Sequence, residues 1–446
     1  MNARKFSKNR LTGLWLILMI LVFTCGTVSA DEAVSIVVDV NQKLRTFNEK
    51  VLGIGGPDKR IWWAGHAELI ATLSNAKIKI VRIGPAQTGL YNSNKSGRRD
   101  IYPEPGQWVW ENVDPIIKTI FDAGSEPLFL VNAYPGGVPS YKTNGALPTS
   151  AAHWAEYARY MRGIVKHFNV DKALGPGHTI RYWEMWNEPE IEPDGKLTKD
   201  AYKAFFNTVG TAMKEVDPTI KLLGPVSQSY RFSHDWLPWA REHLTNLDIV
   251  SWHQYAPRWG SDEARMATNV LMYRDAVIAE RALGKGTAIT EYHCGSMSNR
   301  ANYSNEFGAA FLGSALVNAI QGGVDIFSVF ISYHPWENSV LSADFKPLRS
   351  FYPYYLLGNF HGETIVSSTG GNKWIEHVAT TSTRSGETYV MVVNKDAARK
   401  NYSLSLKVNG MPSSGKVAVR KVDADTLPTE SVTLAYSESV LPYTLS

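Results

Sequence analysis

The chain has very few cysteines. Only Cys25 and Cys294 occur among its 446 residues, and Cys25 lies in an apolar segment that we expect to be removed. Cys294 then has no partner within the chain, so an intramolecular disulfide is excluded even in an oxidising compartment. The stability of the fold must therefore come from a large hydrophobic core.

Several motifs of cofactor and nucleophile chemistry are absent as well. No Gly-x-Ser-x-Gly elbow is present, which argues against a serine esterase. Residues 53–56, Gly-Ile-Gly-Gly, are too short for a dinucleotide fingerprint, and no ligand set has the spacing of His-Glu-x-x-His. His253, His293 and Cys294 support a metal site only weakly, so we predict neither a metal nor an organic cofactor.

The chain also lacks an apolar run long enough to span a membrane. Its longest unbroken run, Leu14–Phe23, falls short of the roughly 20 residues that a span needs. Basic residues precede this run, and residues 28–30, Val-Ser-Ala, follow with the small side chains that a signal peptidase recognises. Residues 1–30 are therefore predicted to be a signal peptide of a secreted protein. A retained anchor is one alternative, and lipidation of Cys25 is another, for which Thr24 is a poor neighbour.

An excess of charge of one sign is missing from the predicted mature chain. The signal peptide holds Arg4, Lys5, Lys8 and Arg10 and no acidic residue, so its removal lowers the 46 Lys and Arg to 42, equal to Asp plus Glu. The formal charge of +4 thus belongs to the signal peptide. A neutral protein has no electrostatic reason to bind nucleic acid or an anionic membrane, and we predict neither as a partner.

Residues 51–360 alternate short β-rich runs with longer segments that carry apolar residues at helical spacing. The predicted strands are Leu52–Gly55, Ile78–Ile83, Pro127–Asn132, Arg181–Trp186, Leu222–Val226, Ile249–Tyr255, Thr287–Glu291 and Ile326–Ser332. The predicted helices include Ala151–Phe168, Thr198–Val216, Ala264–Leu283 and Asn305–Gln321. Eight strands joined by helical crossovers predict an α/β fold, a (β/α)8 TIM barrel. A doubly wound open sheet is the alternative, but its Gly-rich phosphate loop is absent.

Both ends of the chain differ from this pattern. Residues 31–50 contain the β-rich run Val34–Val40, and residues 361–446 contain alternating runs separated by turn residues. Examples of the C-terminal runs are Tyr389–Val393, Tyr402–Val408 and Lys416–Val422. We predict an accessory antiparallel β-sandwich that the N-terminal strand joins. A structural brace is favoured over a carbohydrate-binding module, because the strands of the sandwich come from both ends of the chain.

Two glutamates stand at the carboxyl ends of predicted barrel strands. Glu188 follows the fourth strand, and Glu291 ends the seventh, 103 residues later. In a barrel these positions lie across the mouth at which the βα-loops converge. Glycoside hydrolysis requires two carboxyl groups that flank one glycosidic bond. We therefore predict a glycosidase that acts on a carbohydrate substrate, with Glu188 and Glu291 as its catalytic residues.

The surrounding residues carry a specific resemblance. Residues 186–189, Trp-Asn-Glu-Pro, resemble the acid/base motif of clan A glycoside hydrolases, and residues 289–292, Ile-Thr-Glu-Tyr, resemble their nucleophile strand. Within the clan the sequence is most similar to glycoside hydrolase family 39, which includes β-xylosidases and α-L-iduronidases. That similarity rests on residues 183–189, 221–225 and 249–255. Glu190 departs from the family pattern, which commonly has Asn after the proline.

The resemblance implies double displacement with retention. Glu291 attacks the anomeric carbon, while Glu188 protonates the leaving oxygen and later deprotonates the incoming water. The mechanism needs the two carboxyl groups about 5 to 5.5 Å apart. It also implies that Asn187 hydrogen-bonds the sugar 2-hydroxyl and that Arg82 holds Glu291 ionised.

Three further residues follow from the same resemblance. His253 and Tyr255 lie two residues apart on one strand, so their side chains point to the same side. Tyr255 is expected to donate to the nucleophile, and His253 to contact the acid/base or the substrate. Trp336 resembles the aromatic floor beneath the sugar. Purely structural roles are the alternatives for Arg82, Asn187, His253 and Trp336.

The substrate is less closely defined. Trp62, Trp63, Tyr134 and Trp259 also follow strand ends and are either subsite or core residues. The loop at residues 84–110 carries Lys95, Arg98, Arg99 and Asp100 and is expected to shape one end of the cleft, as a solvated loop rather than a binding site for acidic glycans. Secretion favours a polysaccharide or oligosaccharide, with plant cell-wall xylan or arabinan as the first expectation. A transglycosidase and a noncatalytic carbohydrate-binding protein remain alternatives.

Overall fold

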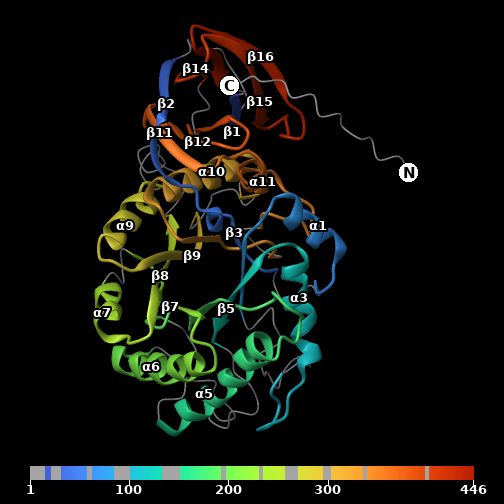
Figure 1. The fold of residues 1–446 in the computed structure, drawn as a ribbon, viewed down its shortest axis with the longest axis vertical. Helices are drawn as coiled ribbons and strands as arrows, with labels where there is room; N and C mark the ends of the chain where they lie inside the picture. The colour runs from blue at the N-terminus through green and yellow to red at the C-terminus, as the bar shows by residue number, and fades with distance from the viewer. Residues whose placement is uncertain are drawn as a thin grey trace.

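The computed structural model describes two bodies, a ring of strands and helices and a smaller sheet beside it (Figure 1). The residues that it describes are 16–21, 32–57, 63–84, 101–132, 151–191, 197–230, 235–256, 270–294, 303–334, 339–396 and 401–445.

The larger body is a closed barrel of eight parallel strands. Its strands are β3 (Gly53–Gly55), β4 (Ile80–Ile83), β5 (Glu126–Val131), β6 (Tyr182–Met185), β7 (Lys221–Ser227), β8 (Leu247–Ala256), β9 (Gly286–Cys294) and β10 (Ile326–Val329). They follow one another around the barrel in chain order, and β10 closes the ring against β3. The predicted fold class is confirmed, and each predicted barrel strand overlaps one of these eight.

Helices surround the barrel on its outer side (Figure 1). The described α-helices are α1 (Ala67–Asn75), α3 (Asp114–Asp122), α5 (Ala151–Val165), α6 (Lys199–Val216), α7 (Trp236–His243), α9 (Met272–Arg281), α10 (Glu306–Gly322) and α11 (Tyr352–Asn359). Short helical turns are Glu49–Val51, Trp110–Asn112, the π-turn Lys166–Val170 and Arg349–Phe351. None of the helices in the described ranges is long and apolar enough to cross a membrane.

The helix ends follow from local side-chain chemistry. The Thr198 hydroxyl accepts a hydrogen bond from the backbone N–H of Ala201 and thereby caps α6. Asn305 caps α10 in the same way through the N–H of Phe307. Gly323 follows the last residue of α10 as its C-cap, and its φ of 80° belongs to the left-handed region that glycine adopts most readily.

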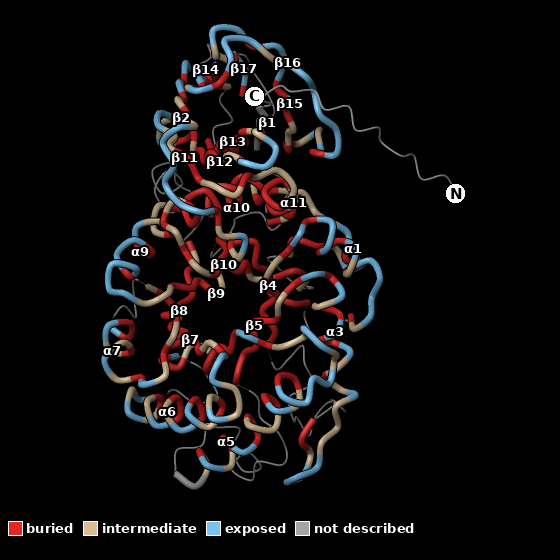
Figure 2. Tube along the Cα trace, in the orientation of Figure 1, coloured by how far each residue is buried: buried red, intermediate tan, exposed pale blue. Residues whose placement is uncertain are grey.

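The hydrophobic core lies on both sides of the barrel wall (Figure 2). Inside the barrel, one residue from each of the strands β4 to β10 forms a separate apolar layer. The layer consists of Ile80, Leu128, Tyr182, Leu223, Ile249, Ala288 and Ile326. This packed interior makes the barrel a rigid support for the side chains at the strand ends.

Helix α10 is buried on almost every side because it lies between the barrel and the second sheet (Figure 1, Figure 2). Its Gln321 side chain donates to the carbonyl oxygen of His377 in the second sheet. Ser314, also on α10, hydrogen-bonds the carboxylate of Glu376. These contacts join the two bodies through one helix.

The second sheet contains strands from both ends of the chain and closes on itself. Its strands are β1 (Leu16–Leu21), β2 (Glu32–Thr46), β11 (Thr364–Gly370), β12 (Ile375–Thr381), β13 (Thr388–Asn394), β14 (Tyr402–Asn409), β15 (Ser414–Val422), β16 (Val432–Ser437) and β17 (Val440–Leu445). Strand β2 pairs antiparallel with β11 and parallel with β14. Most other pairs are antiparallel.

Strand β1 comes from within the predicted signal peptide. It pairs parallel with β13 on one side and with β15 on the other, and the Met19 side chain is buried. Cleavage after residue 30 would remove β1 and leave β13 and β15 without this partner. The signal peptide therefore stays a prediction, with a structural consequence that an experiment can measure.

Candidate active site

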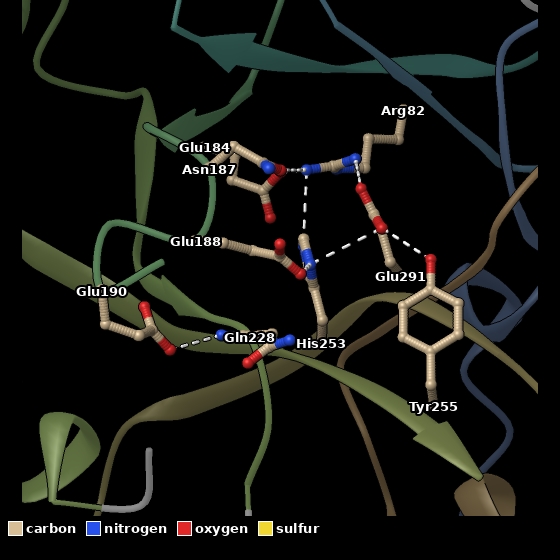
Figure 3. Close-up of polar contacts among 9 residues, drawn as sticks. All are labelled: Arg82, Glu184, Asn187, Glu188, Glu190, Gln228, His253, Tyr255 and Glu291. Carbon is tan, nitrogen blue, oxygen red and sulfur yellow. Dashed lines mark hydrogen bonds and ion pairs between the residues drawn. The ribbon is translucent and has the colours of Figure 1, made fainter. Parts of the chain in front are cut away.

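The carboxyl ends of four barrel strands bring seven polar side chains together (Figure 3). The cluster consists of Arg82 from β4, Glu184 from β6, Asn187 and Glu188 from the turn after β6, His253 and Tyr255 from β8, and Glu291 from β9. Strand β4 is buried along its whole length, and Arg82 is the single charged residue among its four. A buried charge is costly unless it is paired, so Arg82 needs ion-pair or hydrogen-bond partners inside the barrel mouth.

The turn that carries Glu188 is tied to the neighbouring strand. The Glu188 N–H donates to the carbonyl oxygen of Val226 on β7, at 3.0 Å. Trp186, Glu188 and Val226 have φ values of 76°, 42° and 60°, in a region that side chains other than glycine rarely adopt. Each such residue costs about 1–3 kcal/mol of strain, which persists at sites whose surroundings hold the backbone in place.

Glu188 and Glu291 face each other at short range. One carboxylate oxygen of each, together with a ring nitrogen of His253, lie within 4.8 Å of one another. The Glu188 and Glu291 side chains are 18% and 12% exposed, so both are largely shielded and still reach solvent. Two carboxyl groups this close can act on opposite sides of one bond.

Both oxygens of Glu291 are held by donors. Nη1 of Arg82 lies 2.5 Å from Oε1, and the Tyr255 hydroxyl donates to Oε2 at 2.7 Å. Burial acts to raise the pKa of Glu291, but the positive charges of His253 and Arg82 and these hydrogen bonds lower it below its usual value. Glu291 is therefore ionised, oriented and suited to a nucleophilic role.

Arg82 contacts Glu184 and Asn187 as well as Glu291. Its Nε lies 2.5 Å from Oε2 of Glu184, and its Nη2 donates to Oδ1 of Asn187 at 2.9 Å. The second bond turns the Asn187 amide oxygen toward Arg82 and the NH₂ group the other way. Burial acts to lower the pKa of Arg82, but Glu184 and Glu291 raise it, so the guanidinium stays charged.

His253 connects the two glutamates. Its Nδ1 lies 2.8 Å from Oε1 of Glu188 and 3.6 Å from Oε2 of Glu291, while its Nε2 lies 3.4 Å from Nη2 of Arg82. A guanidinium only donates, so the ring in its neutral form accepts at Nε2 and carries its proton on Nδ1, which donates to Glu188. In its protonated form the ring carries the positive charge that lowers the pKa of Glu291. Burial acts to lower the pKa of His253, but the two carboxylates outweigh it and raise that pKa.

A cavity of about 360 Å³ opens beside these groups. Among the described residues it is lined by Glu188, Gln228, Ser229, Tyr255 and Glu291. Its volume falls in the range of about 300–1,000 Å³ typical of small-molecule sites.

A larger cavity, of about 510 Å³, lies at the opposite end of the barrel, where Lys221, Gly286 and Ile326 begin their strands. TIM-barrel active sites occupy the C-terminal face, and the smaller cavity is the one beside the paired carboxylates.

The sequence over residues 38–280 matches the family model of glycosyl hydrolases family 39. That match covers more than half of the chain and includes Glu188. The chain belongs to glycosyl hydrolases family 39. The protein is therefore a glycosidase that acts on a carbohydrate.

Solved structures share the whole fold of this family 39 member at low sequence identity. A monomeric β-xylosidase from Caulobacter crescentus CB15 superposes with a TM-score of 0.67 at 14% identity, over 92% of this chain and 97% of the other. The GH39 enzyme from Xanthomonas axonopodis pv. citri gives 0.65 at 12% identity, over 94% and 96%. A GH51 α-L-arabinofuranosidase from Thermotoga petrophila RKU-1 gives 0.64 at 15% identity, over 93% and 98%. No curated protein matches the sequence of this chain.

Most of the predicted site residues of this family 39 enzyme meet in one cluster. Arg82, Asn187, Glu188, His253, Tyr255 and Glu291 are linked by the contacts given above. Trp336 lies outside the described residues, as do Trp62, Tyr134, Trp259 and the charged loop residues Lys95, Arg98, Arg99 and Asp100. Trp63 is only 2% exposed and packs in the hydrophobic core.

Glu184, Glu190 and Gln228 were missed in the sequence analysis. Glu184 is fully buried, and a lone acidic residue among the apolar residues of β6 was the available signal for an inward-facing charge. Glu190 was noted only as a departure from the family pattern. No local pattern marks Gln228, because its place at the cavity comes from the packing of one loop on another.

Glu188, His253 and Glu291 also have the ligand types and mutual distances of a possible metal site. Arg82, however, already hydrogen-bonds Oε1 of Glu291, and a divalent cation there would face that buried positive charge. The arrangement of this family 39 site therefore suits acid/base and nucleophilic chemistry by the side chains themselves.

Proposed function

We propose that this family 39 enzyme is a secreted retaining glycosidase that cleaves O-glycosidic bonds by double displacement. The proposal rests on one observation above the others, the mutual distance of at most 4.8 Å between carboxylate oxygens of Glu188 and Glu291. Retaining glycosidases hold their carboxyl groups about 5–5.5 Å apart, whereas inverting enzymes separate them by about 6.5–9.5 Å to admit a water molecule.

In the first step Glu291 attacks the anomeric carbon as the glycosidic C–O bond breaks. Glu188 gives its proton to the leaving oxygen, so the products are a glycosyl ester on Glu291 and a neutral alcohol. In the second step Glu188 takes a proton from water, the resulting hydroxide attacks the same carbon, and the ester C–O bond breaks. Esterification removes the negative charge of Glu291, which favours the ionised form of Glu188 that acts as base.

The supporting residues act on one glutamate each. Arg82 and Tyr255 hold both oxygens of Glu291, which keeps it ionised and aimed. His253 donates from Nδ1 to Glu188 and orients its carboxyl group. We propose that Asn187 donates to the sugar 2-hydroxyl and that Trp336 forms the floor beneath the sugar.

The substrate class is proposed from the similar proteins. A β-xylosidase and an α-L-arabinofuranosidase are among the structures that share this fold. The sugars in these two names, xylose and arabinose, occur in plant cell-wall xylan and arabinan, which are polymers that a secreted enzyme meets. Oligosaccharides of xylose and arabinose are therefore the first substrates to test.

The test is reducing-sugar release by residues 31–446 from xylan, arabinan, other plant and microbial polysaccharides, and a panel of aryl glycosides. Glu291→Gln is measured beside the wild type, because it keeps the size of the side chain and removes its charge. We expect wild-type turnover of at least one substrate and its loss in the variant. Turnover that survives in Glu291→Gln would overturn the assignment of the nucleophile.

The stereochemistry and the acceptor are read from the same reaction. Proton NMR of the first-formed sugar should show the anomeric configuration of the substrate, and inversion would contradict the proposed mechanism. Products longer than the substrate at high sugar concentration would indicate transglycosylation with the same two glutamates. Binding without turnover of any substrate would support a noncatalytic carbohydrate-binding protein.

A further inference from the structure

Gln228 lies at the cavity although neither half of the proposed mechanism uses it. It follows β7 directly, and it lines the cavity together with Glu188, Tyr255 and Glu291. Figure 3 draws it on the Glu188 side of the cluster, across from Arg82. Its side-chain amide forms no hydrogen bond within the described part of the chain, and its backbone N–H forms one.

That backbone bond fixes the loop after β7 to the loop after β6. The Gln228 N–H donates to Oε1 of Glu190 at 2.6 Å, and Glu190 is only 8% exposed. Two residues earlier on each side, the Glu188 N–H donates to the carbonyl oxygen of Val226. The Glu190 carboxylate thus extends the pairing of β6 and β7 beyond the ends of the strands. The extension reaches two residues beyond Glu188, the proposed acid/base.

The position of Gln228 places it near the part of the substrate that leaves in the first step. In the proposed reaction the sugar that stays on the enzyme is attached to Glu291, and the group that leaves takes its proton from Glu188. A side chain on the Glu188 side of the cavity therefore meets the leaving group. A primary amide offers a donor and an acceptor side by side, which matches two neighbouring hydroxyl groups of a sugar ring.

We infer that Gln228 is a specificity-determining residue that binds the leaving sugar, and that Glu190 is the positioning residue that holds it there. This inference rests on the proposed retaining function and adds the class of the leaving group, a sugar with free neighbouring hydroxyls. An aryl leaving group offers no such hydroxyls and gains nothing from the amide.

The experiment compares two substrates that differ only in the leaving group. They are the disaccharide and the 4-nitrophenyl glycoside of the sugar that the wild-type enzyme releases. For Gln228→Ala we expect kcat/KM on the disaccharide to fall about tenfold further than on the aryl glycoside, the loss of one or two neutral hydrogen bonds. Equal losses on both substrates, or no loss on either, would overturn the inference.

Variants of Glu190 test its positioning role. Glu190→Gln keeps an acceptor oxygen at the same distance along the side chain, whereas Glu190→Ala removes it. The ratio of kcat/KM between disaccharide and aryl glycoside should fall in Glu190→Ala as in Gln228→Ala, and Glu190→Gln should restore most of it. If Glu190 had only a structural role, Glu190→Ala would lower kcat/KM equally on both substrates and leave their ratio at its wild-type value. That result would contradict the positioning role.

A matched control separates these effects from the loss of a glutamine as such. Gln42 is exposed on β2 in the second sheet, and Gln42→Ala should keep the wild-type ratio. A wild-type enzyme that turns over neither substrate would refute the proposed function itself. An active wild type whose ratio is unchanged in Gln228→Ala would refute only the role of Gln228.

Discussion

Nε of Arg82 lies 2.5 Å from Oε2 of Glu184, and the same guanidinium contacts Glu291 through Nη1 at 2.5 Å. One buried positive charge is therefore shared between a carboxylate that carries out no chemistry and the proposed nucleophile. Oε1 of Glu184 is buried with no hydrogen-bond partner in the described residues, so Arg82 is the group that compensates its charge. This sharing sets how strongly Arg82 stabilises the anionic form of Glu291.

Glu184→Gln should change the pH dependence of the enzyme. Without the charge of Glu184, Arg82 stabilises ionised Glu291 more strongly, so the acidic limb of kcat/KM should move to lower pH. The more stabilised carboxylate is also a weaker nucleophile, and we expect kcat to fall by about tenfold. Steady-state kinetics as a function of pH give both kcat and the acidic limb of kcat/KM, and a limb that moves to higher pH would contradict the shared-charge model.

Glu184→Ala should destabilise the fold much more than Glu184→Gln. Removal of one partner from a buried ion pair commonly costs about 3–5 kcal/mol in the free energy of unfolding. The glutamine keeps an oxygen that can accept from Nε of Arg82 and should cost less. Urea unfolding of both variants measures the difference, and equal stability of the two would show that this hydrogen bond contributes little.

Tyr255→Phe should weaken catalysis while the fold stays intact. The variant loses the hydrogen bond to Oε2 of Glu291, the oxygen that faces His253. Burial and the charge of Glu291 raise the pKa of Tyr255 well above its usual value, so the hydroxyl remains a donor throughout the working range. We expect kcat/KM to fall about 10- to 100-fold and the acidic limb to move to higher pH. Steady-state kinetics as a function of pH tests both.

The acidic limb in the pH profile of kcat/KM of the wild-type enzyme should lie at low pH. The pKa of Glu291 is lowered, so the nucleophile remains ionised below the usual glutamate value of about 4.3. We expect the midpoint of the limb in kcat/KM below that pH. Measurement with a neutral aryl glycoside avoids titration of the substrate, and a midpoint above the usual value would contradict the assignment of this limb to Glu291.

The shifted pKa values of Glu291 and His253 predict opposite dependences of the folding stability on pH. The contribution of Glu291 is present above its unfolded pKa and is lost as the pH falls through its lowered folded pKa. The pKa of His253 is raised, so its contribution is full below about 6.5 and is lost as the pH rises through the folded value. Thermal unfolding from acidic to neutral pH should therefore show less acid destabilisation in Glu291→Gln than in the wild type.

Removal of residues 1–30 should leave the active site unchanged. Strand β1 belongs to the second sheet, whereas the site side chains come from β4, β6, β8 and β9. We expect residues 31–446 to keep the kcat of the full chain, and any fall in the unfolding temperature to arise from the open edges of β13 and β15. N-terminal sequencing of the exported protein checks the cleavage site, and a first residue other than Asp31 would contradict the predicted one.

Local patterns were sufficient for the barrel and for both glutamates. Short β-rich runs precede both glutamates, so Glu188 and Glu291 could be placed near the barrel mouth in advance, although Glu188 lies three residues after β6 and β9 continues past Glu291 to Cys294. Alternation along β8 likewise placed His253 and Tyr255 on one side. These inferences need only the period of a strand and the geometry of a closed parallel sheet.

Contacts between distant segments could not be read in this way. Arg82 meets Glu184 across 102 positions of sequence, and Glu190 meets Gln228 across 38. Whether a buried charge has one partner or two depends on the spacing of neighbouring strands and on side-chain rotamers, which packing selects. The amino-acid order determined which groups stand at the barrel mouth, and tertiary packing decided which of them share a charge, because Coulomb and hydrogen-bond energies depend on distance in space and not along the chain.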